Sequence, residues 1–427
     1  GKIYGPALEE ILVEDGNPYL ESIQGVLYQQ ADAESGALRT LLYYPLNHPA
    51  EEYTVEEGTQ VLSRYAIAGS VNLRKLTLCS SIQEWDRSII NMPVLEELVL
   101  EEGVAYTKYW DLMEACPELK ILDIRTDDVR MSALGDFPIL DEIRLGKNVL
   151  KENLLPSSWG SQTKSYVVEE GNSSYQVYGG ALCDYEGTLL FYPAGSEDTT
   201  YQIPDGITTI GESAFKSSNH LTTVTVGDQV QEIKDQAFER CMGLTSIQLD
   251  GNLRVMGDSV FASCEALETF SLESQEEDFE LGSWILSRCY SLSSVYFDVK
   301  AKVEMSTFED VTGIKLLELG SQVEGVDIDT VTSIQHFIVD EKNPYLKADQ
   351  EMLLDKAGKR VIMYAASNPQ TSCQIPEGVE TIGERSFCSS RNLEEVQLPS
   401  TLTAIGDEAF RVCSGLLNIT IPEGTKS

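Results

Sequence analysis

The chain has 427 residues, of which 42% are hydrophobic and 23% are charged. Its 69 acidic and 31 basic residues give a net charge of −38, which excludes nucleic acid and anionic membrane surfaces as partners because phosphate groups bind basic patches. No run of eighteen apolar residues occurs, so the sequence predicts no membrane-spanning segment.

The pattern apolar-x-x-apolar-x-apolar recurs twelve times along the chain. Its copies begin at Leu73, Leu95, Leu119, Leu140, Leu221, Leu244, Leu267, Leu292, Ile314, Ile334, Leu393 and Leu416. Within a run, neighbouring copies begin 20 to 25 residues apart, which is the period of a leucine-rich repeat. A unit of this size cannot bury a core alone, so the copies are expected to stack into a solenoid.

The end of each copy predicts a β-strand, because apolar and polar residues alternate there. Val224 and Val226 are expected to point inward, and Thr223 and Thr225 outward. Stacked strands then form a parallel sheet, which we place on the concave face of a strand-rich, right-handed superhelix. Turns and short helical or 3-10 segments are expected to complete each coil.

A phenylalanine stands six residues before the copies beginning at Leu221, Leu244 and Leu267 and before several others. These residues are Phe215, Phe238, Phe261, Phe308, Phe387 and Phe410. The stretch around each predicts a turn followed by a short helical segment that packs its Phe inward. Leu286 and Met113 occupy the same position in two other copies, and three residues after this position stands a small residue, which is a cysteine at Cys116, Cys241, Cys264, Cys289 and Cys413. A buried small residue explains this pattern, so all nine thiols are predicted to be free.

A longer repeat overlies the short one. The segments VEDGNPYL (13–20), VEEGNSSY (168–175) and VDEKNPYL (339–346) each precede a strand, a polar turn and a second strand, which predicts a hairpin. We therefore predict one continuous solenoid over 1–427, with modules 1–164, 165–335 and 336–427 that each open with a hairpin-bearing coil. No polar capping repeat is visible at the C-terminal end, so we expect a fragment or an exposed final strand edge.

The segments IPDGITTIGESAFKSSNHLTTVTV and IPEGVETIGERSFCSSRNLEEVQL resemble the BspA-like class of leucine-rich repeats found in bacterial and protozoan surface antigens. The resemblance is specific over 203–272 and from 375 onward, and looser over 55–145 and 281–339. It implies a secreted or surface-attached protein of interaction or adhesion type, whose signal peptide has been removed, with no enzymatic activity. No functional residue carries over, because the repeat pattern is structural.

The predicted outward positions in the middle of the sheet carry no charge. They are Thr223, Thr225, Ser246, Gln248, Thr269, Ser271, Ser294 and Tyr296. Such a neutral, hydrogen-bonding strip suits a glycan or a protein loop, and its alternative is an ordinary solvated sheet face. Tyr106, Tyr109 and Trp110 depart from the repeat and form a second binding candidate; packing within a turn is the alternative there.

Residue patterns that carry chemistry are missing from the sequence. His48, His220 and His336 lack a partner at metal-ligand spacing, and the acidic segments 275–278 and 327–329 lack the glycine and spacing of a calcium loop. No nucleophile elbow or phosphate-binding glycine run occurs. The sequence therefore predicts no catalytic residue, no metal and no cofactor.

Our first hypothesis is a non-enzymatic, monomeric extracellular leucine-rich repeat protein that binds a protein or a glycan in cell adhesion or host interaction. The second is a rigid structural spacer or self-associating surface-layer component. The third is an enzyme whose site lies on the irregular coil 146–164.

Overall fold

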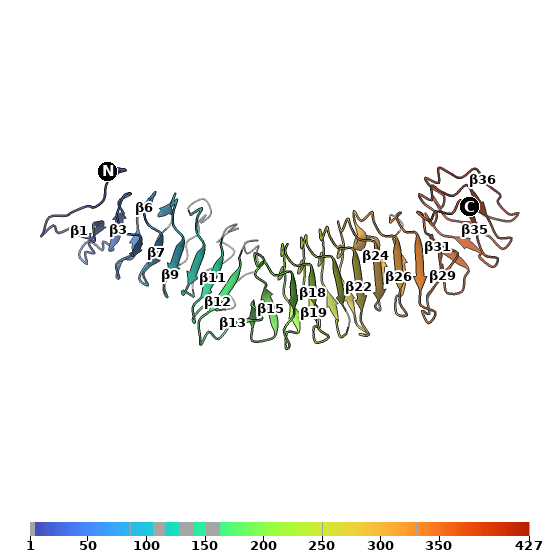
Figure 1. Cartoon of the computed structure of the whole chain (residues 1–427), viewed down its shortest axis with the longest axis horizontal. Helices are drawn as coiled ribbons and strands as arrows, with labels where there is room; N and C mark the ends of the chain where they lie inside the picture. The colour runs from blue at the N-terminus through green and yellow to red at the C-terminus, as the bar shows by residue number, and fades with distance from the viewer. Residues whose placement is uncertain are drawn as a thin grey trace. The chain divides into compact units, whose positions relative to one another are not determined.

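Short strands, one or two from each copy of the repeat, are the main regular elements of this computed structural model, and turns connect them (Figure 1). It describes residues 5–85, 87–105, 116–127, 140–150, 163–249, 251–328 and 331–426. The chain divides into two compact units, Gly1–Glu197 and Asp198–Ser427. Each is a β-solenoid of stacked parallel coils, which confirms the predicted fold class. The three modules of one continuous solenoid stay a prediction.

The first unit contains a six-stranded parallel sheet. In spatial order its strands are β12 (Ser165–Val168), β11 (Glu142–Leu145), β10 (Ile121–Ile124), β9 (Glu97–Leu100), β7 (Lys75–Leu78) and β4 (Glu52–Thr54). Leu76, Leu98, Leu122 and Ile143 lie opposite one another in register and are buried. The inward positions of the repeat therefore form one continuous apolar row.

Two hairpins also lie in the first unit, at the places predicted from the longer repeat. One joins β1 (Leu20–Ile23), β2 (Val26–Gln29) and β3 (Thr40–Tyr43), with β5 (Val61–Leu62) parallel to β3. The other joins β13 (Tyr175–Tyr178), β14 (Ala181–Asp184) and β15 (Thr188–Phe191). The short strands β6 (Ile67–Ala68) and β8 (Ile89–Ile90) pair in parallel.

The second unit has a seven-stranded parallel sheet along one side of its coils. Its strands, in order, are β16 (Thr200–Gln202), β18 (Thr223–Thr225), β20 (Ser246–Leu249), β22 (Thr269–Glu273), β24 (Ser294–Asp298), β26 (Leu316–Leu319) and β28 (His336–Val339). A three-stranded sheet of β32 (Ser372–Gln374), β34 (Glu395–Gln397) and β36 (Asn418–Ile419) is built in the same way.

Shorter strands form a second side of these coils. The first group is β17 (Thr209–Ile210), β19 (Glu232–Ile233), β21 (Val255–Met256) and β23 (Glu280–Leu281), and the second is β25 (Lys302–Glu304) with β27 (Gly325–Asp327). The third hairpin consists of β29 (Leu346–Asp349), β30 (Met352–Asp355) and β31 (Arg360–Tyr364), and continues in parallel through β33 (Thr381–Ile382) and β35 (Ala404–Ile405).

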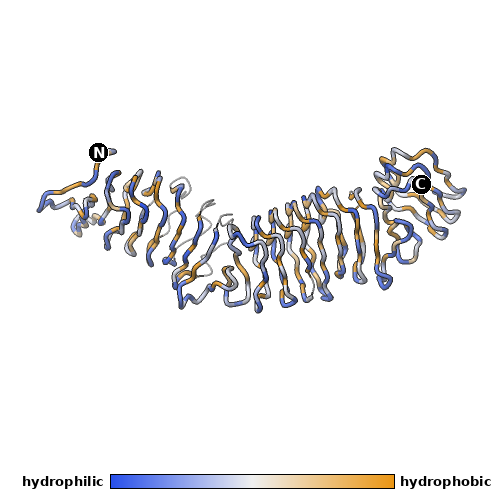
Figure 2. Tube along the Cα trace, in the orientation of Figure 1, coloured by the Kyte–Doolittle hydropathy of each residue, from blue (hydrophilic) through white to orange (hydrophobic). Residues whose placement is uncertain are grey.

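Hydrophobic and hydrophilic stretches alternate along every coil (Figure 2). The predicted Phe ladder is part of the apolar interior: Phe215, Phe238 and Phe261 are fully buried. The Phe215 and Phe238 ring centroids are 4.7 Å apart with an interplanar angle of 10°, and those of Phe238 and Phe261 are 5.1 Å apart at 15°. These three coils therefore share a hydrophobic interior, as the stacking of the repeat predicts.

The stretch before each strand differs from the expected helical segment. Among the described residues one 3-10 helix occurs, η3 (Met305–Phe308), and the other coils in which this stretch is described form it as an arc of turns. Two residues in each arc have a positive φ, for example Ser213 and Ser217, at 55° and 61°. The same two positions recur at Gln236 and Arg240, Ser259 and Ser263, Trp284 and Arg288, and Glu408 and Val412.

The arcs hold neighbouring coils together through their backbones. The N–H groups of three successive Phe residues donate to the following coil: Phe215 to Ala237 O at 2.7 Å, Phe238 to Val260 O at 2.9 Å and Phe261 to Ile285 O at 2.9 Å. In an α-helix these N–H groups would donate to the residue four positions earlier in their own coil. The positive φ angles in the arcs thus replace backbone hydrogen bonds within a coil by backbone hydrogen bonds between coils.

The cysteine ladder is also formed as predicted, and all nine cysteines are free thiols. Successive ladder thiols of the second unit donate to the carbonyl of the Phe one coil earlier: Cys241 to Phe215 O at 3.0 Å, Cys264 to Phe238 O at 3.1 Å and Cys289 to Phe261 O at 3.2 Å. Burial raises the pKa of the Cys264 and Cys289 thiols well above its usual value, so both stay protonated donors.

Alanine substitutions at this repeat position are expected to affect the free energy of unfolding differently in two coils. Cys264→Ala removes a buried S–H···O bond and should lower the free energy of unfolding by about 1–2 kcal/mol. The Ser218 hydroxyl is equally buried but has no hydrogen-bond partner among the described residues, so Ser218→Ala should leave stability unchanged or raise it. Urea denaturation followed by circular dichroism measures both, and equal losses would contradict the assignment.

A buried asparagine attaches the second and third hairpins to the coil before them. Asn343 Nδ2 donates to Gly320 O at 2.7 Å and Val323 O at 2.9 Å, while its Oδ1 accepts the N–H groups of Tyr345 and Leu346, both at 2.8 Å. Asn172 makes the same four bonds in the second hairpin, to Gly146 O, Val149 O and the N–H groups of Ser174 and Tyr175. The longer repeat therefore encodes this clamp.

Candidate functional site

The eight residues of the predicted neutral strip lie on four adjacent strands of the seven-stranded sheet. We call Thr223, Thr225, Ser246, Gln248, Thr269, Ser271, Ser294 and Tyr296 the hydroxyl strip. Thr223, Ser246, Thr269 and Ser294 lie opposite one another in one row, and Gln248, Ser271 and Tyr296 in a second. All eight are exposed or half-buried. Parallel strands lie about 4.8 Å apart, so the sheet presents evenly spaced polar groups.

Two further strands extend the strip into a different chemistry. Leu316 lies opposite Ser294, and Glu318 lies opposite Tyr296. On β28, His336 and Ile338 continue the two rows, and the Ile338 side chain is 50% exposed. The face therefore passes from hydroxyl groups to an apolar and acidic end.

Carboxylates gather beside Tyr296. Burial, followed by the negative charges of Asp298, Glu273 and Asp340, raises the pKa of the Tyr296 phenol to about 12. Asp298 is itself buried, and its Oδ1 accepts the Gln322 N–H at 2.9 Å. Tyr296 is thus a neutral hydrogen-bonding group in a negative environment.

One contact at this end was not predicted from the sequence. His336 Nδ1 lies 3.1 Å from Glu351, which belongs to the β29–β30 turn fifteen residues later. His48 differs: it is buried, with Nε2 2.7 Å from Gln24 O and Nδ1 3.2 Å from the Tyr44 hydroxyl, so its role is structural. Within the described ranges no three His, Cys, Asp or Glu side chains are placed to hold a metal ion.

The equivalent sheet face of the first unit is charged instead of neutral. Lys75 Nζ lies 2.9 Å from Glu97, and Arg144 lies 3.3 Å from Glu97 and 2.6 Å from Glu142. A hollow of about 340 Å³ beside them contains Arg125, which pairs with Asp123 at 2.8 Å. Because these charges neutralise one another in pairs, the face offers fewer free groups to a ligand than the hydroxyl strip does.

The remaining predicted sites lie outside what the structure describes. Tyr106, Tyr109 and Trp110 fall in 106–115, and most of the coil 146–164 falls in 151–162. Their roles stay predictions. In the described part of the chain no helix is long and apolar enough to cross a membrane.

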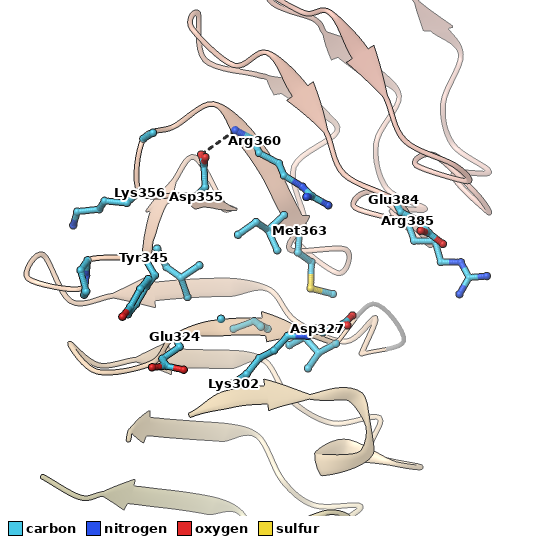
Figure 3. Close-up of a pocket in the computed structure, with 17 residues that line it drawn as sticks. Lys302, Glu324, Asp327, Tyr345, Asp355, Lys356, Arg360, Met363, Glu384 and Arg385 are labelled. Atoms are coloured by element: carbon cyan, nitrogen blue, oxygen red, sulfur yellow. Dashed lines mark hydrogen bonds and ion pairs between the residues drawn. The ribbon is translucent and has the colours of Figure 1, made fainter. Parts of the chain in front are cut away.

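A larger cavity, of about 990 Å³, lies in the second unit beside the third hairpin (Figure 3). We call it the cleft. Its apolar residues are Val326, Ile328 and Leu346 with Ile362 and Met363, and Tyr345, which is 47% exposed, stands at one end. Its charged residues are Lys302, Glu324, Asp327, Asp355, Lys356, Arg360, Glu384 and Arg385. Sequence analysis missed this cavity because the repeat pattern does not encode it.

Residues 191–324 and 363–427 match the model of the BspA type leucine rich repeat region, in six copies. The chain contains BspA-type leucine-rich repeats. The resemblance predicted from the Phe and Cys positions is thereby confirmed, and the BspA-type region 191–324 includes the whole hydroxyl strip. No curated protein sequence matches the chain.

Several solved structures resemble this chain. A leucine-rich repeat protein from Eubacterium ventriosum is 14% identical, with 94% of this chain and 90% of that chain covered and a TM-score of 0.36. One from Bacteroides ovatus is 17% identical, with 92% and 91% covered and a TM-score of 0.37. A leucine rich cell surface protein from Faecalibacterium prausnitzii is 15% identical, with 94% of each chain covered and a TM-score of 0.30.

Proposed function

We propose that this chain is a non-enzymatic extracellular binding protein that holds a protein ligand on the sheet face of its second unit, in adhesion to a host or neighbouring cell. Solenoids of stacked repeats bind ligands along extended surfaces, which supports a binding role. The observation that carries the proposal is the in-register hydroxyl strip, which is uncharged in a chain with a net charge of −38.

A protein suits this face better than a glycan does. Stable protein interfaces combine an apolar, aromatic centre with a polar rim. Tyr296 of the hydroxyl strip, Leu316 and Ile338 lie on three adjacent strands, with Glu318 between Tyr296 and Ile338. The rest of the hydroxyl strip borders them on one side, and His336 with Glu351 borders them on the other. The surrounding carboxylates favour a partner with basic side chains at its edge.

Substitution in the middle of the strip is expected to weaken binding without changing the fold. Thr269→Arg places a long charged side chain at an exposed strand position, so affinity for the protein ligand should fall at least about tenfold. Thr312→Arg, at an exposed position outside the strands, is the matched control and should bind as the parent chain does. Biolayer interferometry measures both, using ligands first identified on arrays of host proteins and glycans.

Three outcomes would count against the proposal. An array without any saturable signal would remove the binding role. Saturable binding of glycans alone would replace the protein ligand by a carbohydrate. Concentration-dependent assembly in light scattering that Thr269→Arg abolishes would favour the self-associating surface layer.

A further inference from the structure

The ladder of short strands in the second unit is interrupted at the cleft. β17, β19, β21 and β23 pair one after another in parallel, and β31, β33 and β35 do the same. Between these groups, β27 pairs with β25 and with no other strand among the described residues. One edge of β27 therefore has main-chain N–H and C=O groups without a strand partner.

The cleft lies along this interruption. Gly325, Val326 and Asp327 of β27 line it, and so do Arg360, Ile362 and Met363 of β31. β31 is paired on both sides, with β30 and with β33, and β29 pairs with β30 but with no strand of the preceding coil among the described residues, so the hairpin leaves this edge of β27 open. Figure 3 shows Lys302, Glu324 and Asp327 on one side of the cavity and Arg360 and Met363 on the other.

We propose that the cleft binds an extended peptide, which pairs with β27 as an added strand. An open strand edge is completed by main-chain groups at a regular spacing, and an extended polypeptide supplies these, whereas a glycan does not. The cavity of about 990 Å³ is within the size of known ligand sites, and its apolar residues can receive alternate side chains of such a strand.

The charges of the cleft indicate which peptide is accepted. Most charged groups have partners: Lys302 with Asp327 at 3.3 Å, Arg385 with Glu408 at 2.8 Å, Lys356 Nζ with Glu341 O at 2.8 Å, and Asp355 Oδ1 with the N–H groups of Lys359 and Arg360 at 2.7 and 2.9 Å. The Arg360 guanidinium has no hydrogen-bond or ion-pair partner in the part of the chain that the structure describes. It selects a peptide with a carboxylate beside it, because guanidinium binds carboxylate in a two-pronged geometry.

Glu324 and Glu384 also line the cleft without an ion-pair partner among the described residues. They lie apart from Arg360 in Figure 3, with Glu324 on the side of Lys302 and Glu384 beside Arg385. These two carboxylates disfavour a uniformly acidic peptide. The accepted sequence therefore has a single acidic position in an otherwise neutral or basic strand.

The probe is a phage-displayed library of random dodecapeptides, selected on the immobilised full chain and followed by binding of synthetic copies. Gly325→Trp fills the cleft and should weaken binding at least about tenfold. Gly325→Ala is the matched control: an added Cβ meets Lys302 Cγ at 3.5 Å, an ordinary contact, so binding should stay within about twofold. Arg360→Gln should remove the preference for an acidic side chain.

Main-chain pairing has its own signature. Two probes are compared, one N-methylated at its odd-numbered peptide bonds and one at its even-numbered peptide bonds. One should lose binding and the other should keep it, because successive N–H groups of a strand point to opposite edges. Equal effects of the two methylation patterns would overturn the proposal that the peptide pairs as an added strand. Failure to select any peptide whose binding Gly325→Trp weakens would overturn the site.

A second copy of this chain is the other possible occupant. A dimer in light scattering that Gly325→Trp dissociates would assign the β27 edge to self-pairing and overturn the peptide proposal. Thr269→Arg separates this inference from the proposed function, because it changes the hydroxyl strip and should leave peptide binding in the cleft unchanged.

Discussion

Phe238→Ala is expected to lower the free energy of unfolding by about 3–5 kcal/mol. The ring is fully buried and stacks on both neighbours, at centroid distances of 4.7 Å to Phe215 and 5.1 Å to Phe261. Its removal leaves a cavity that the fixed coil spacing prevents from closing. Guanidinium denaturation followed by circular dichroism measures the loss.

Phe410→Ala is the matched control for the Phe ladder. Phe410 is half-buried, and its ring stacks on Phe387 at 5.0 Å and on no other ring among the described residues. The same truncation should therefore cost clearly less at 410 than at 238. Equal losses at the two positions would show that burial between two coils is not what stabilises the ladder.

Asn343→Ala should destabilise the second unit by about 3 kcal/mol or more, because it removes four buried hydrogen bonds with one side chain. Two backbone carbonyls and two backbone N–H groups lose their partner. Denaturation followed by tyrosine fluorescence measures the loss, since Tyr345 and Tyr364 belong to the hairpin that the clamp attaches.

Two variants test the origin of that loss. Asn343→Asp keeps the two accepted bonds and loses the two donated ones, so it should still be destabilising. Asn17→Ala, at the equivalent position of the first hairpin, removes two side-chain bonds among the described residues, those that Asn17 Oδ1 accepts from Tyr19 and Leu20, and should cost about 1 kcal/mol. An Asn17→Ala effect as large as that of Asn343→Ala would contradict the clamp.

Features that recur once per coil could be predicted residue by residue. Phe238 and Cys264 each occupy a position that returns with nearly the same period, so stacking places equivalent residues in contact. The hydroxyl strip follows from strand alternation alone, which puts Thr269 and Ser271 on one face. Their placement is confirmed by the register of β20, β22 and β24, while their role in binding stays a prediction.

Features that depend on backbone angles could not be predicted from the sequence. Positive φ angles usually indicate glycine, yet the arcs use Ser213, Gln236 and Trp284, whose side chains give no such signal. The inter-coil hydrogen bonds compensate the strain of these angles. A helical segment was therefore the natural expectation, and it occurs only at Met305–Phe308 among the described residues.

Contacts made by the hairpins had a partial signal. Asn17, Asn172 and Asn343 occupy the same position of the longer repeat, so their recurrence marked a structural role that the sequence interpretation did not use. The pairing of His336 with Glu351 and the cleft beside β27 had no signal in the sequence. Both depend on the path of one hairpin, which no period describes.

The successive arcs that contain Phe215, Phe238 and Phe261 donate to the coil after them in the same way. Neighbouring coils therefore make equivalent contacts with the coils on either side. Duplication of one whole unit of 23 residues, the spacing of Phe215, Phe238 and Phe261, would recreate every ring stack and thiol bond at the new junctions. One extra residue inside an arc would instead move its Phe out of line. Evolution can thus lengthen such a solenoid by whole turns far more readily than it can change the circumference of a turn.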